Sequence, residues 1–389
     1  MAVGTFDCWP RKVVSGPGSL LQVGDLIRAM DKTRVIVFTD SVIQRLPVVV
    51  NLIDRLKSQG FSVSVFADIG PNPTEKMVHD AVDFMRGERP EVIVGIGGGS
   101  PIDAGKAANV VYTHGGNVKD YDIAANGIAR ITPKLLPYIA VPTTAGTGSE
   151  VTFVGVITDT GRQTKFGVLS PLLIPDVAVL DPEVTVSMPP GLTAATGVDA
   201  LTHCIEAYTS AVGFPPADAL ALHGTCMISR SLRAAVNDGR NLEAREEMLV
   251  ASMMAGTAFS LNGLGICHAM AHQLSAFFDM PHGMANAILL PRIMRFNLPA
   301  NVQKFARIAE AMGLDTGGMS LQEAAEKAVE MVEQLSNNVG LPRYLDDAGG
   351  TKDGIPGLVE RAMADPVHRT NPRPVTPADV EDLFRRSFR

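Results

Sequence analysis

The sequence predicts an α/β domain built on a parallel sheet, followed by an all-α domain. In the first half of the chain, short runs of β-branched residues alternate with helical segments. The second half is rich in Ala, Leu, Met and Glu and contains almost no such runs. The chain has 389 residues, which is too long for one ordinary hydrophobic core and favours more than one domain.

The elements of the first half follow one another in a regular order. The strand-like runs are residues 34–40, 62–66, 91–96, 138–141, 153–158 and 177–180. The helical runs between the first four of them are residues 47–59, 74–86 and 101–112. Strands that alternate with helices of this length pair in parallel through right-handed crossovers. We therefore expect a Rossmann-like parallel sheet.

The pattern of apolar residues changes after residues 180–190, LDPEVTVSMPP. From Leu192 onward the apolar residues recur with a helical period. This change predicts a dinucleotide-binding domain at residues 1–188 and a helical domain at residues 189–389. A cleft between two such domains is a natural place for a ligand.

Composition and charge exclude several classes of protein. The formal net charge is −7, whereas a nucleic-acid partner requires a basic surface. The chain has no uninterrupted apolar run of about 18 residues, so we expect no membrane span. The cysteines Cys8, Cys204, Cys226 and Cys267 form no CxxC pair, and the start MAVGTFDCWP does not have the pattern of a secretory leader. These features predict a cytoplasmic protein with reduced thiols.

A glycine-rich segment at residues 95–106, GIGGGSPIDAGK, follows a predicted strand and leads into a predicted helix. We expect Ser100 to cap this helix, with Pro101 at its first position and Asp103 completing a capping box. The glycines leave backbone N–H groups open to an anion, and the start of a helix favours negative charge. The segment is not a GxGxxG fingerprint. It predicts a phosphate-binding turn, with a tight turn that holds no ligand as the alternative.

Two further features favour a dinucleotide. The segment PTTAGTGSE, residues 142–150, follows the next predicted strand, and the hydroxyls of Thr143, Thr144 and Thr147 suit phosphate or ribose. An ordinary loop is the alternative for each threonine alone. Asp40 ends the 34–40 strand, where a carboxylate accepts hydrogen bonds from ribose hydroxyls and repels a 2′-phosphate. It favours NAD over NADP, although an aspartate there is also a common turn residue.

A set of histidines in the second half indicates a metal site. Asp199 and His203 in GVDALTHCIEAY are four residues apart, and so are His268 and His272 in CHAMAHQLSAFFDMPHGMAN. His282 follows beyond a turn. One carboxylate with imidazoles suits Fe²⁺, Zn²⁺, Co²⁺ or Mn²⁺ and is a poor site for Ca²⁺ or Mg²⁺. Spacing leaves open whether His268 or His272 is the ligand, and each histidine taken singly could be a core side chain.

These motifs together resemble those of the iron-containing (group III) alcohol dehydrogenases. The resemblance is carried by GGGSPIDAGK, PTTAGTGSE, GVDALTHCIEAY, CHAMAHQLSAFFDMPHGMANAILLP and NPRPVTPADV, and it runs over nearly the full length. The most similar branch contains lactaldehyde:propanediol oxidoreductase. The resemblance implies the dehydroquinate synthase-like fold of this family and a hydride transfer between NAD(H) and a small alcohol or aldehyde. It also implies Fe²⁺, with Zn²⁺ in some relatives, and a homodimer or larger homo-oligomer.

The resemblance assigns roles to individual residues. The implied metal ligands are Asp199, His203, His268 and His282. The implied contacts to NAD are Asp40, Asn72, Gly98, Gly99, Ser100, Thr143, Thr144, Thr147 and Lys165. His272 is then a nearby residue that does not ligate, and we expect it to relay protons during catalysis.

The expected substrate pocket departs from that of the most similar branch. Val154 and Gly155 stand where that branch carries an asparagine and a bulky aromatic residue, and Val367 stands at a cysteine position beside His368. Phe259 matches an aromatic residue of the family's pocket. A roomier, less polar pocket favours a longer aliphatic or aromatic alcohol, or an acidic aldehyde paired with His368.

Other functions remain as alternatives at this point. A hydroxyacid–oxoacid transhydrogenase would hold NAD tightly and show no net turnover without a second substrate. A glycerol dehydrogenase or dehydroquinate synthase relative would use a different ligand set. A non-catalytic nucleotide-binding protein would need a broken set of ligands or a blocked cleft, and the sequence contains the whole set of ligands.

Overall fold

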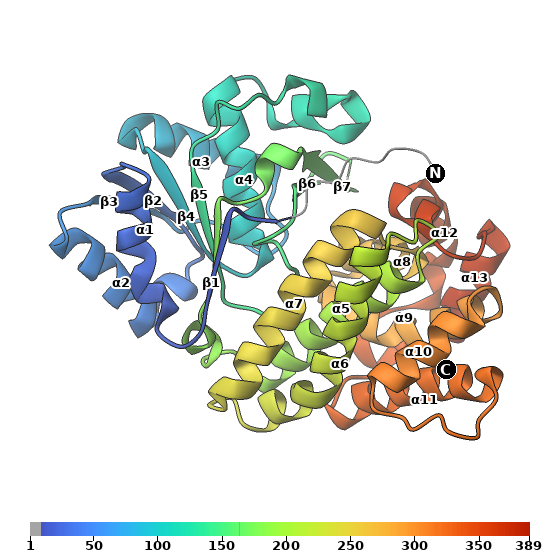
Figure 1. Ribbon diagram of the computed structural model, residues 1–389. Coiled ribbons are helices and arrows are strands. Elements are labelled where there is room, and N and C mark those ends of the chain that lie inside the picture. The colour runs from blue at the N-terminus through green and yellow to red at the C-terminus, as the bar shows by residue number, and fades with distance from the viewer. Residues whose placement is uncertain (1–8, 163) are drawn as a thin grey trace. The chain divides into compact units, whose positions relative to one another are not determined.

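The computed structural model describes residues 9–162 and 164–389, and the chain divides into two compact units. The first consists of the described residues of Met1–Thr144 together with Gly148–Ser187. The second consists of Ala145–Thr147 and Met188–Arg389. In Figure 1 the first unit is the α/β part, coloured blue to green, and the second is the helical part, coloured yellow-green to red.

A six-stranded sheet forms the centre of the first unit. Its strand order is β1-β8-β5-β4-β2-β3, and every neighbouring pair is parallel. The strands are β1 Lys12–Ser15, β2 Arg34–Phe38, β3 Ser62–Phe66, β4 Val92–Gly97, β5 Tyr138–Pro142 and β8 Val177–Leu180. The helices of this unit are α1 Val23–Ala29, α2 Pro47–Ser58, α3 Glu75–Glu88 and α4 Gly99–His114. The predicted parallel sheet with crossover helices is confirmed.

Helices cover both faces of this sheet, as the side chains of β2 show. Val35 and Val37 pack in one apolar cluster with residues of α1 and α2. Ile36 and Phe38 point to the other face and pack with residues of α3 and α4. Successive side chains of a strand alternate between faces, so a strand covered on both faces must be apolar throughout. This requirement explains the continuous apolar run that made β2 recognisable in the sequence.

Two strands were not predicted from the sequence. Both are weakly patterned, because β1 is short with only half-buried valines and β7, Thr164–Leu169, is mostly half-buried. β7 pairs antiparallel with β6, Val154–Asp159, in a separate two-stranded sheet. The fold therefore contains an antiparallel hairpin between the parallel strands β5 and β8.

The predicted capping box at the glycine-rich turn is wrong. Helix α4 begins at Gly99 with Gly98 as its N-cap, so Ser100 lies within the first turn and makes no capping hydrogen bond. Asp103 instead accepts hydrogen bonds from Ser149 Oγ (2.8 Å) and the backbone N–H of Val156 (3.1 Å). Asp103 thus holds the segment after β5, from Ser149 to Val156, against α4. Because the N-cap is a glycine, the first N–H groups of α4 have no side-chain acceptor from the N-cap residue.

The second unit is a helical assembly around α5, Pro190–Thr209. α5 packs against α6, α7 and α9, and nearly all of its side chains after Leu192 are buried. The remaining helices are α6 Pro215–Asn237, α7 Leu242–Asn262, α8 Ile266–Phe278, α9 His282–Asn297, α10 Val302–Ala311, α11 Leu321–Asn338, α12 Ile355–Ala364 and α13 Pro377–Arg386. Polar residues on α5 are therefore carried into the core of this unit.

Two of the sequence-based expectations concern membranes and thiols. Among the described residues no single helix has both the length and the apolar character to cross a membrane; α7 and α8 pass that test only as a pair, which is bent by 109°. Cys204, Cys226 and Cys267 are free thiols. Cys8 and most of the N-terminal segment considered as a possible leader lie outside the described residues.

Candidate functional site

Helix α5 carries the first two candidate ligands into the core of the second unit. Asp199 and His203 lie one turn apart and are only 3% and 5% exposed. A carboxylate and an imidazole at this depth are costly unless they have polar partners or a metal. The burial of α5 on several sides is thus the reason that these side chains meet other polar groups and not water.

The break between α8 and α9 brings two more histidines to Asp199. α8 ends at Phe278, and α9 begins at His282. One ligand atom from each of Asp199, His268 and His282 lies within 4.8 Å of the others. The Nε2 atoms of His268 and His282 lie 3.8 Å and 3.6 Å from Asp199 Oδ1. Residues from three helices therefore converge on one point.

Gly283 makes this convergence possible. A Cβ at this position would lie 2.2 Å from the backbone oxygen of Ala195 on α5. The start of α9 thus approaches the backbone of α5 more closely than any other residue would allow. The glycine in the motif PHG places His282 beside Asp199.

His203 adjoins this group without belonging to it. Its ring stacks on the His268 ring at 4.4 Å between centroids and on the Phe259 ring at 4.6 Å. Its Nδ1 lies 3.1 Å from the backbone oxygen of Gly146. A carbonyl oxygen only accepts hydrogen bonds, so Nδ1 carries the hydrogen and the lone pair of the neutral ring is on Nε2.

Two polar residues of the cluster were missed in the sequence, Glu206 and Asn286. The Asn286 side-chain nitrogen lies 2.7 Å from Asp199 Oδ1 and 3.2 Å from the Nε2 atoms of both His268 and His282. Glu206 Oε2 lies 2.6 Å from His268 Nδ1. A signal was present, since Glu206 follows His203 by three residues and Asn286 follows His282 by four, spacings that share a helix face.

Burial determines the charge states in this cluster. Burial, opposed by the charge of Asp199, lowers the pKa of His203 to about 4 and that of His268 to about 3. Burial also raises the pKa of Glu206 to about 7. Both imidazoles are therefore neutral near pH 7 and keep a lone pair for a metal. Neutral imidazoles with one carboxylate match the donors that Fe²⁺ and Zn²⁺ prefer.

His272 lies beside the cluster and has a different partner. Its Nδ1 lies 2.7 Å from Asp365 Oδ2, and its ring stacks on His282 at 5.3 Å between centroids. Among the described residues, the group of ligand atoms includes His268 and not His272. This geometry favours His268 over His272 as the ligand, and His203 likewise lies outside the group. Asp365 gave no local signal, because it is 93 residues from His272.

The predicted pocket residues fall in both units. In the second unit Phe259 stacks on His203, and Val367 and His368 lie half-buried in the short helix Pro366–Thr370. His368 Nδ1 lies 2.6 Å from the backbone oxygen of Asp365. This segment is thereby joined to the residue that pairs with His272.

In the first unit, Val154 and Gly155 lie on β6, which packs on α4. A Cβ at position 155 would lie 2.8 Å from the backbone oxygen of Asp103. Close backbone packing therefore accounts for this glycine without reference to a substrate. The backbone oxygen of Val154 accepts a hydrogen bond from Lys106 Nζ at 3.0 Å.

The predicted phosphate-binding turn lies at the carboxyl end of β4. Gly98, Gly99 and Ser100 are half-buried at the start of α4. A Cβ at Gly98 would meet nothing nearer than Thr144, at 3.5 Å. Packing therefore does not require glycine at position 98, the N-cap of α4.

Other candidate cofactor contacts lie at the ends of neighbouring strands. Thr143 follows β5, donates its N–H to the Gly97 oxygen (2.8 Å), and has a buried hydroxyl with no hydrogen-bond partner among the described residues. A buried hydroxyl of this kind indicates a missing ligand or water. β2, β4 and β5 are adjacent in the sheet, and ligands of doubly wound folds bind outside the carboxyl ends of such strands.

Asp40, Asn72 and Lys165 have structural partners of their own. Asp40 Oδ1 accepts hydrogen bonds from the N–H groups of Val42 and Ile43, each at 2.8 Å, so it does stabilise a turn. Asn72 has a φ of 54°, and its backbone oxygen accepts from Thr158 Oγ1 at 3.3 Å. Lys165 lies opposite Thr158 in the β6–β7 hairpin. Thr147 is half-buried and belongs to the second unit.

Buried charges lie beneath the glycine-rich turn. Lys106 is 1% exposed, and its ammonium donates to the backbone oxygens of Ser149, Thr152 and Val154. Burial lowers the pKa of Lys106 to about 8 and raises that of Glu150 to about 7. The ammonium thus holds the loop after β5 against α4.

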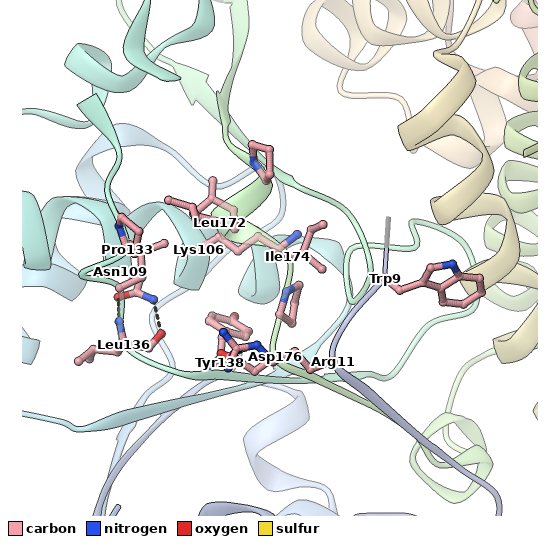
Figure 2. A pocket seen from close by; sticks show the side chains of 14 residues that line it. Trp9, Arg11, Lys106, Asn109, Pro133, Leu136, Tyr138, Leu172, Ile174 and Asp176 are labelled. Carbon is pink, nitrogen blue, oxygen red and sulfur yellow. Dashed lines mark hydrogen bonds and ion pairs between the residues drawn. The ribbon is translucent and has the colours of Figure 1, made fainter. Parts of the chain in front are cut away.

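The residues drawn in Figure 2 line a pocket in the first unit. Its volume is about 290 Å³. Its polar side chains already have protein partners: Asn109 pairs with the backbone of Leu136, and Asp176 accepts from the N–H of Tyr138. None of the residues proposed to bind metal, cofactor or substrate lines it. We therefore assign no ligand to this pocket.

A doubly wound α/β unit and a buried carboxylate–histidine cluster are together the features of a metal-dependent, nucleotide-linked oxidoreductase. The comparison with family models supports this class. Residues 10–182 match the model for iron-containing alcohol dehydrogenase, and residues 193–388 match that for the C-terminal part of the Fe-containing alcohol dehydrogenase family. The chain belongs to the iron-containing alcohol dehydrogenase family, and the predicted family and enzyme class are confirmed.

Characterised relatives span nearly the whole chain. The chain is 41% identical to 1,3-propanediol dehydrogenase of Citrobacter freundii, with 96% of both chains covered. It is 37% identical to lactaldehyde reductase of Escherichia coli K12, covering 96% of this chain and 97% of the relative. It is 35% identical to NAD-dependent methanol dehydrogenase of Bacillus methanolicus, covering 97% and 98%. These names agree with the predicted reaction class and with NAD.

Solved structures confirm the fold. A 1,3-propanediol oxidoreductase is 41% identical, with a TM-score of 0.95 over 99% of this chain and 100% of that one. A sulfoacetaldehyde reductase from Bifidobacterium kashiwanohense, solved with NAD⁺, is 32% identical, with a TM-score of 0.88 over 99% of both chains. The α/β and helical units are thus those of this family.

Proposed function

We propose that the chain interconverts a small alcohol and its aldehyde with NAD(H) at one divalent metal ion. The observation that carries the proposal is the meeting of Asp199, His268 and His282, whose ligand atoms lie within 4.8 Å of one another. Relatives named for propanediol, lactaldehyde and methanol support the substrate class, and the methanol enzyme's name supports NAD.

The proposed metal ligands are Asp199, His203, His268 and His282. The buried, neutral imidazoles and the single carboxylate fit Fe²⁺, the metal of the family name, and Zn²⁺ as the alternative. When bound, such an ion acts as a Lewis acid that polarises the substrate oxygen. His203 is ready for this role because its Nδ1 hydrogen is directed to Gly146.

The cofactor is proposed to bind at the carboxyl ends of β2, β4 and β5, and its nicotinamide exchanges a hydride with the carbinol carbon. The glycines at the start of α4 leave N–H groups open to the pyrophosphate. Asp40 Oδ1 accepts the two hydrogen bonds of the turn. We propose that Oδ2 accepts hydrogen bonds from the ribose hydroxyls. The further proposed contacts are Asn72, Gly98, Gly99, Ser100, Thr143, Thr144, Thr147 and Lys165.

His272 is proposed to move the proton that the reaction releases. Asp365 accepts the hydrogen of His272 Nδ1, so the lone pair of the neutral ring is on Nε2, where it takes up a proton. Asp365 also fixes the ring plane. The histidine is thereby oriented as a general base without being a ligand.

The substrate pocket is proposed to include Val154, Phe259, Val367 and His368, with Gly155 contributing only backbone. Phe259 gives an apolar surface next to His203, and Val367 adds a small apolar side chain close to Asp365. These residues favour an aliphatic or aromatic alcohol. An acidic aldehyde paired with His368 is the other class, and the sulfoacetaldehyde-reducing relative supports testing it.

A screen of NADH oxidation tests the proposal. The protein is loaded anaerobically with Fe²⁺ or Zn²⁺ and offered aldehydes of graded length, with and without an acidic group. We expect metal-dependent turnover with at least one of them and none with the Asp199→Asn variant. Stoichiometric metal without NAD(H)-linked turnover on the whole panel would contradict the proposed function.

We also propose a cytoplasmic homodimer or larger homo-oligomer. The free thiols Cys204, Cys226 and Cys267 support a reducing compartment, and the resemblance to the family supports self-association. Light scattering coupled to size-exclusion chromatography gives the mass of the assembly. A monomer at micromolar concentration would contradict this part of the proposal.

A further inference from the structure

We propose that Glu206 is a positioning residue of the metal site, which fixes the tautomer and the ring orientation of His268. The proposal rests on the proposed function, because it concerns the same metal. Its starting point is the contact of 2.6 Å between Glu206 Oε2 and His268 Nδ1.

The carboxylate of Glu206 lies in a place built for it. Glu206 is on α5, three residues after His203, and is 4% exposed. Its Oε1 accepts the N–H of Cys267 at 2.7 Å. A Cβ at Gly265 would lie 2.6 Å from the same oxygen, so only glycine leaves room for it. The start of α8 thus holds both carboxylate oxygens.

This contact determines which nitrogen of His268 faces the metal ligands. A carboxylate accepts, so Nδ1 carries the hydrogen and the lone pair is on Nε2, the atom 3.8 Å from Asp199 Oδ1. In the other tautomer Nε2 would carry a hydrogen and could not ligate. A carboxylate behind a ligating imidazole also raises its basicity and holds its ring orientation.

The test is the metal affinity of Glu206→Gln. The amide is isosteric but has one acceptor oxygen for two donors, the Cys267 N–H and the His268 Nδ1–H. We expect the affinity for Zn²⁺ or Co²⁺ to fall roughly 10- to 100-fold, measured by competition with a chromophoric chelator. The visible spectrum of bound Co²⁺ should change as the ligand field changes. Glu206→Asp, which keeps two acceptor oxygens on a shorter side chain, should recover part of the affinity.

Glu150→Gln is the matched control. Glu150 is also a buried glutamate, 1% exposed, but it belongs to the first unit, whereas the candidate ligands belong to the second. Its substitution should leave the metal affinity and the Co²⁺ spectrum unchanged. If Glu206→Gln binds metal like the wild type, with the same spectrum, the role of Glu206 is refuted while the proposed function stands. If the wild type itself binds no transition metal, the proposed function fails first.

A measurement on the wild-type protein covers the case in which Glu206→Gln does not fold. In the Zn²⁺-loaded protein, ¹⁵N shifts of the histidine rings distinguish protonated from metal-bound nitrogens, and a His268→Gln variant assigns the signals. We expect His268 to carry its hydrogen on Nδ1 and the metal on Nε2. Metal on Nδ1 would overturn the proposal.

Discussion

Hydrogen bonds at Nδ1 orient three of the histidine rings near Asp199. The Nδ1 atoms of His203, His268 and His272 face the Gly146 oxygen, Glu206 and Asp365. Every one of these partners accepts a hydrogen, so each ring presents the lone pair of Nε2. The difference lies in position, because His268 shares the ligand group of Asp199 and His282 whereas His272 stands outside it.

This arrangement makes a prediction for His272→Ala. Removing the ring should lower kcat roughly 10²- to 10⁴-fold, the usual contribution of a general acid–base group, and leave one metal per site. Turnover is followed by NADH absorbance and metal by mass spectrometry. Asp365→Asn should act in the same direction by a smaller factor. His79→Ala, a histidine of α3 in the first unit, serves as the control and should change neither value.

The metal content of His272→Ala can contradict the role proposed for His272. If the alanine variant loses its metal together with its activity, His272 is a ligand, and the division of roles between His268 and His272 is wrong. Normal turnover with normal metal content would instead remove it from proton transfer.

Asp40 makes a prediction about the choice of cofactor. Asp40→Asn keeps the oxygen that serves the turn at Val42 and Ile43 but removes the charge. The ratio of kcat/KM for NADPH to that for NADH should rise roughly tenfold, because a like charge near the 2′-phosphate costs on the order of 1 kcal/mol or more. Steady-state kinetics with both cofactors measures it. An unchanged ratio would place the adenosine ribose elsewhere.

Glu150 makes a prediction about pH. Burial raises its pKa from 4.5 to about 7, so the folded protein binds this proton more tightly than the unfolded chain. The stabilisation is complete below pH 4.5 and is lost as the pH rises through 7, a change of roughly 3 kcal/mol. Relative to the wild type, the melting temperature of Glu150→Gln should therefore rise between pH 4.5 and 7 and then level off. A difference that does not depend on pH would contradict the shift.

Residues close in sequence were the predictable part of the site. Asp199 with His203, and His268 with His272, share a helix face through a spacing of four, which is visible without a structure. Glu206 and Asn286 lay inside the same motifs, but glutamate and asparagine at helical spacing are ordinary residues, so chemistry alone did not single them out. Asp365 depends on packing between α8 and the end of α12, which no local pattern records.

At the scale of elements, the glycine-rich segment contains one glycine that packing requires and one that packing does not require. A Cβ at Gly105 would lie 2.4 Å from the Tyr138 hydroxyl, so the fold requires that glycine. A Cβ at Gly98 would meet only Thr144, at 3.5 Å, so the fold does not require glycine there. Both belong to the same sequence motif, but Gly98 is the N-cap of α4 and Gly105 lies inside the helix, so different constraints act on them.

Alanine substitutions distinguish the two glycines. Gly98→Ala should raise the Kd for NADH roughly tenfold or more, which corresponds to 1.4 kcal/mol, while costing under about 1 kcal/mol of capping. Gly105→Ala should lower the stability by about 1–3 kcal/mol through overpacking and leave the affinity of the folded protein for NADH nearly unchanged. Fluorescence titration and thermal unfolding measure the two effects. Equal Kd values for Gly98→Ala and the wild type would place the pyrophosphate elsewhere.

Strands were easiest to predict where both faces are covered. β4, β5 and the part of β2 after Arg34 form apolar runs because helices bury both of their faces, and these runs stand out in the sequence. β1 and β7 have half-buried side chains, and their pattern resembles that of a loop. The prediction of a capping box was wrong because Asp103 has other partners. Its carboxylate accepts hydrogen bonds from Ser149 and Val156, which are distant in sequence and give no local signal.

At the scale of the molecule, the two units hold different candidate functions. The proposed ligands Asp199, His203, His268 and His282 all belong to the second unit. The turn at Gly98 and the strand ends proposed to hold NAD(H) belong to the first, which has its own apolar clusters on both faces of its sheet. We therefore expect the fold of the glycine-rich turn not to depend on a bound metal, whereas Thr147, another proposed contact, belongs to the second unit and follows Gly146, the partner of His203.

Removal of the metal tests this independence. After treatment with a strong chelator and desalting, turnover should be lost, whereas the Kd for NADH should change only slightly, because the glycine-rich turn keeps its fold. The melting temperature should fall, since a ligand at 1,000 times its Kd contributes about 4 kcal/mol to the folded state. Adding back Fe²⁺ anaerobically, or Zn²⁺, should restore both activity and melting temperature. Loss of NADH binding together with the metal would show that the nucleotide site needs the ion, and full turnover of the metal-free protein would remove the ion from the chemistry.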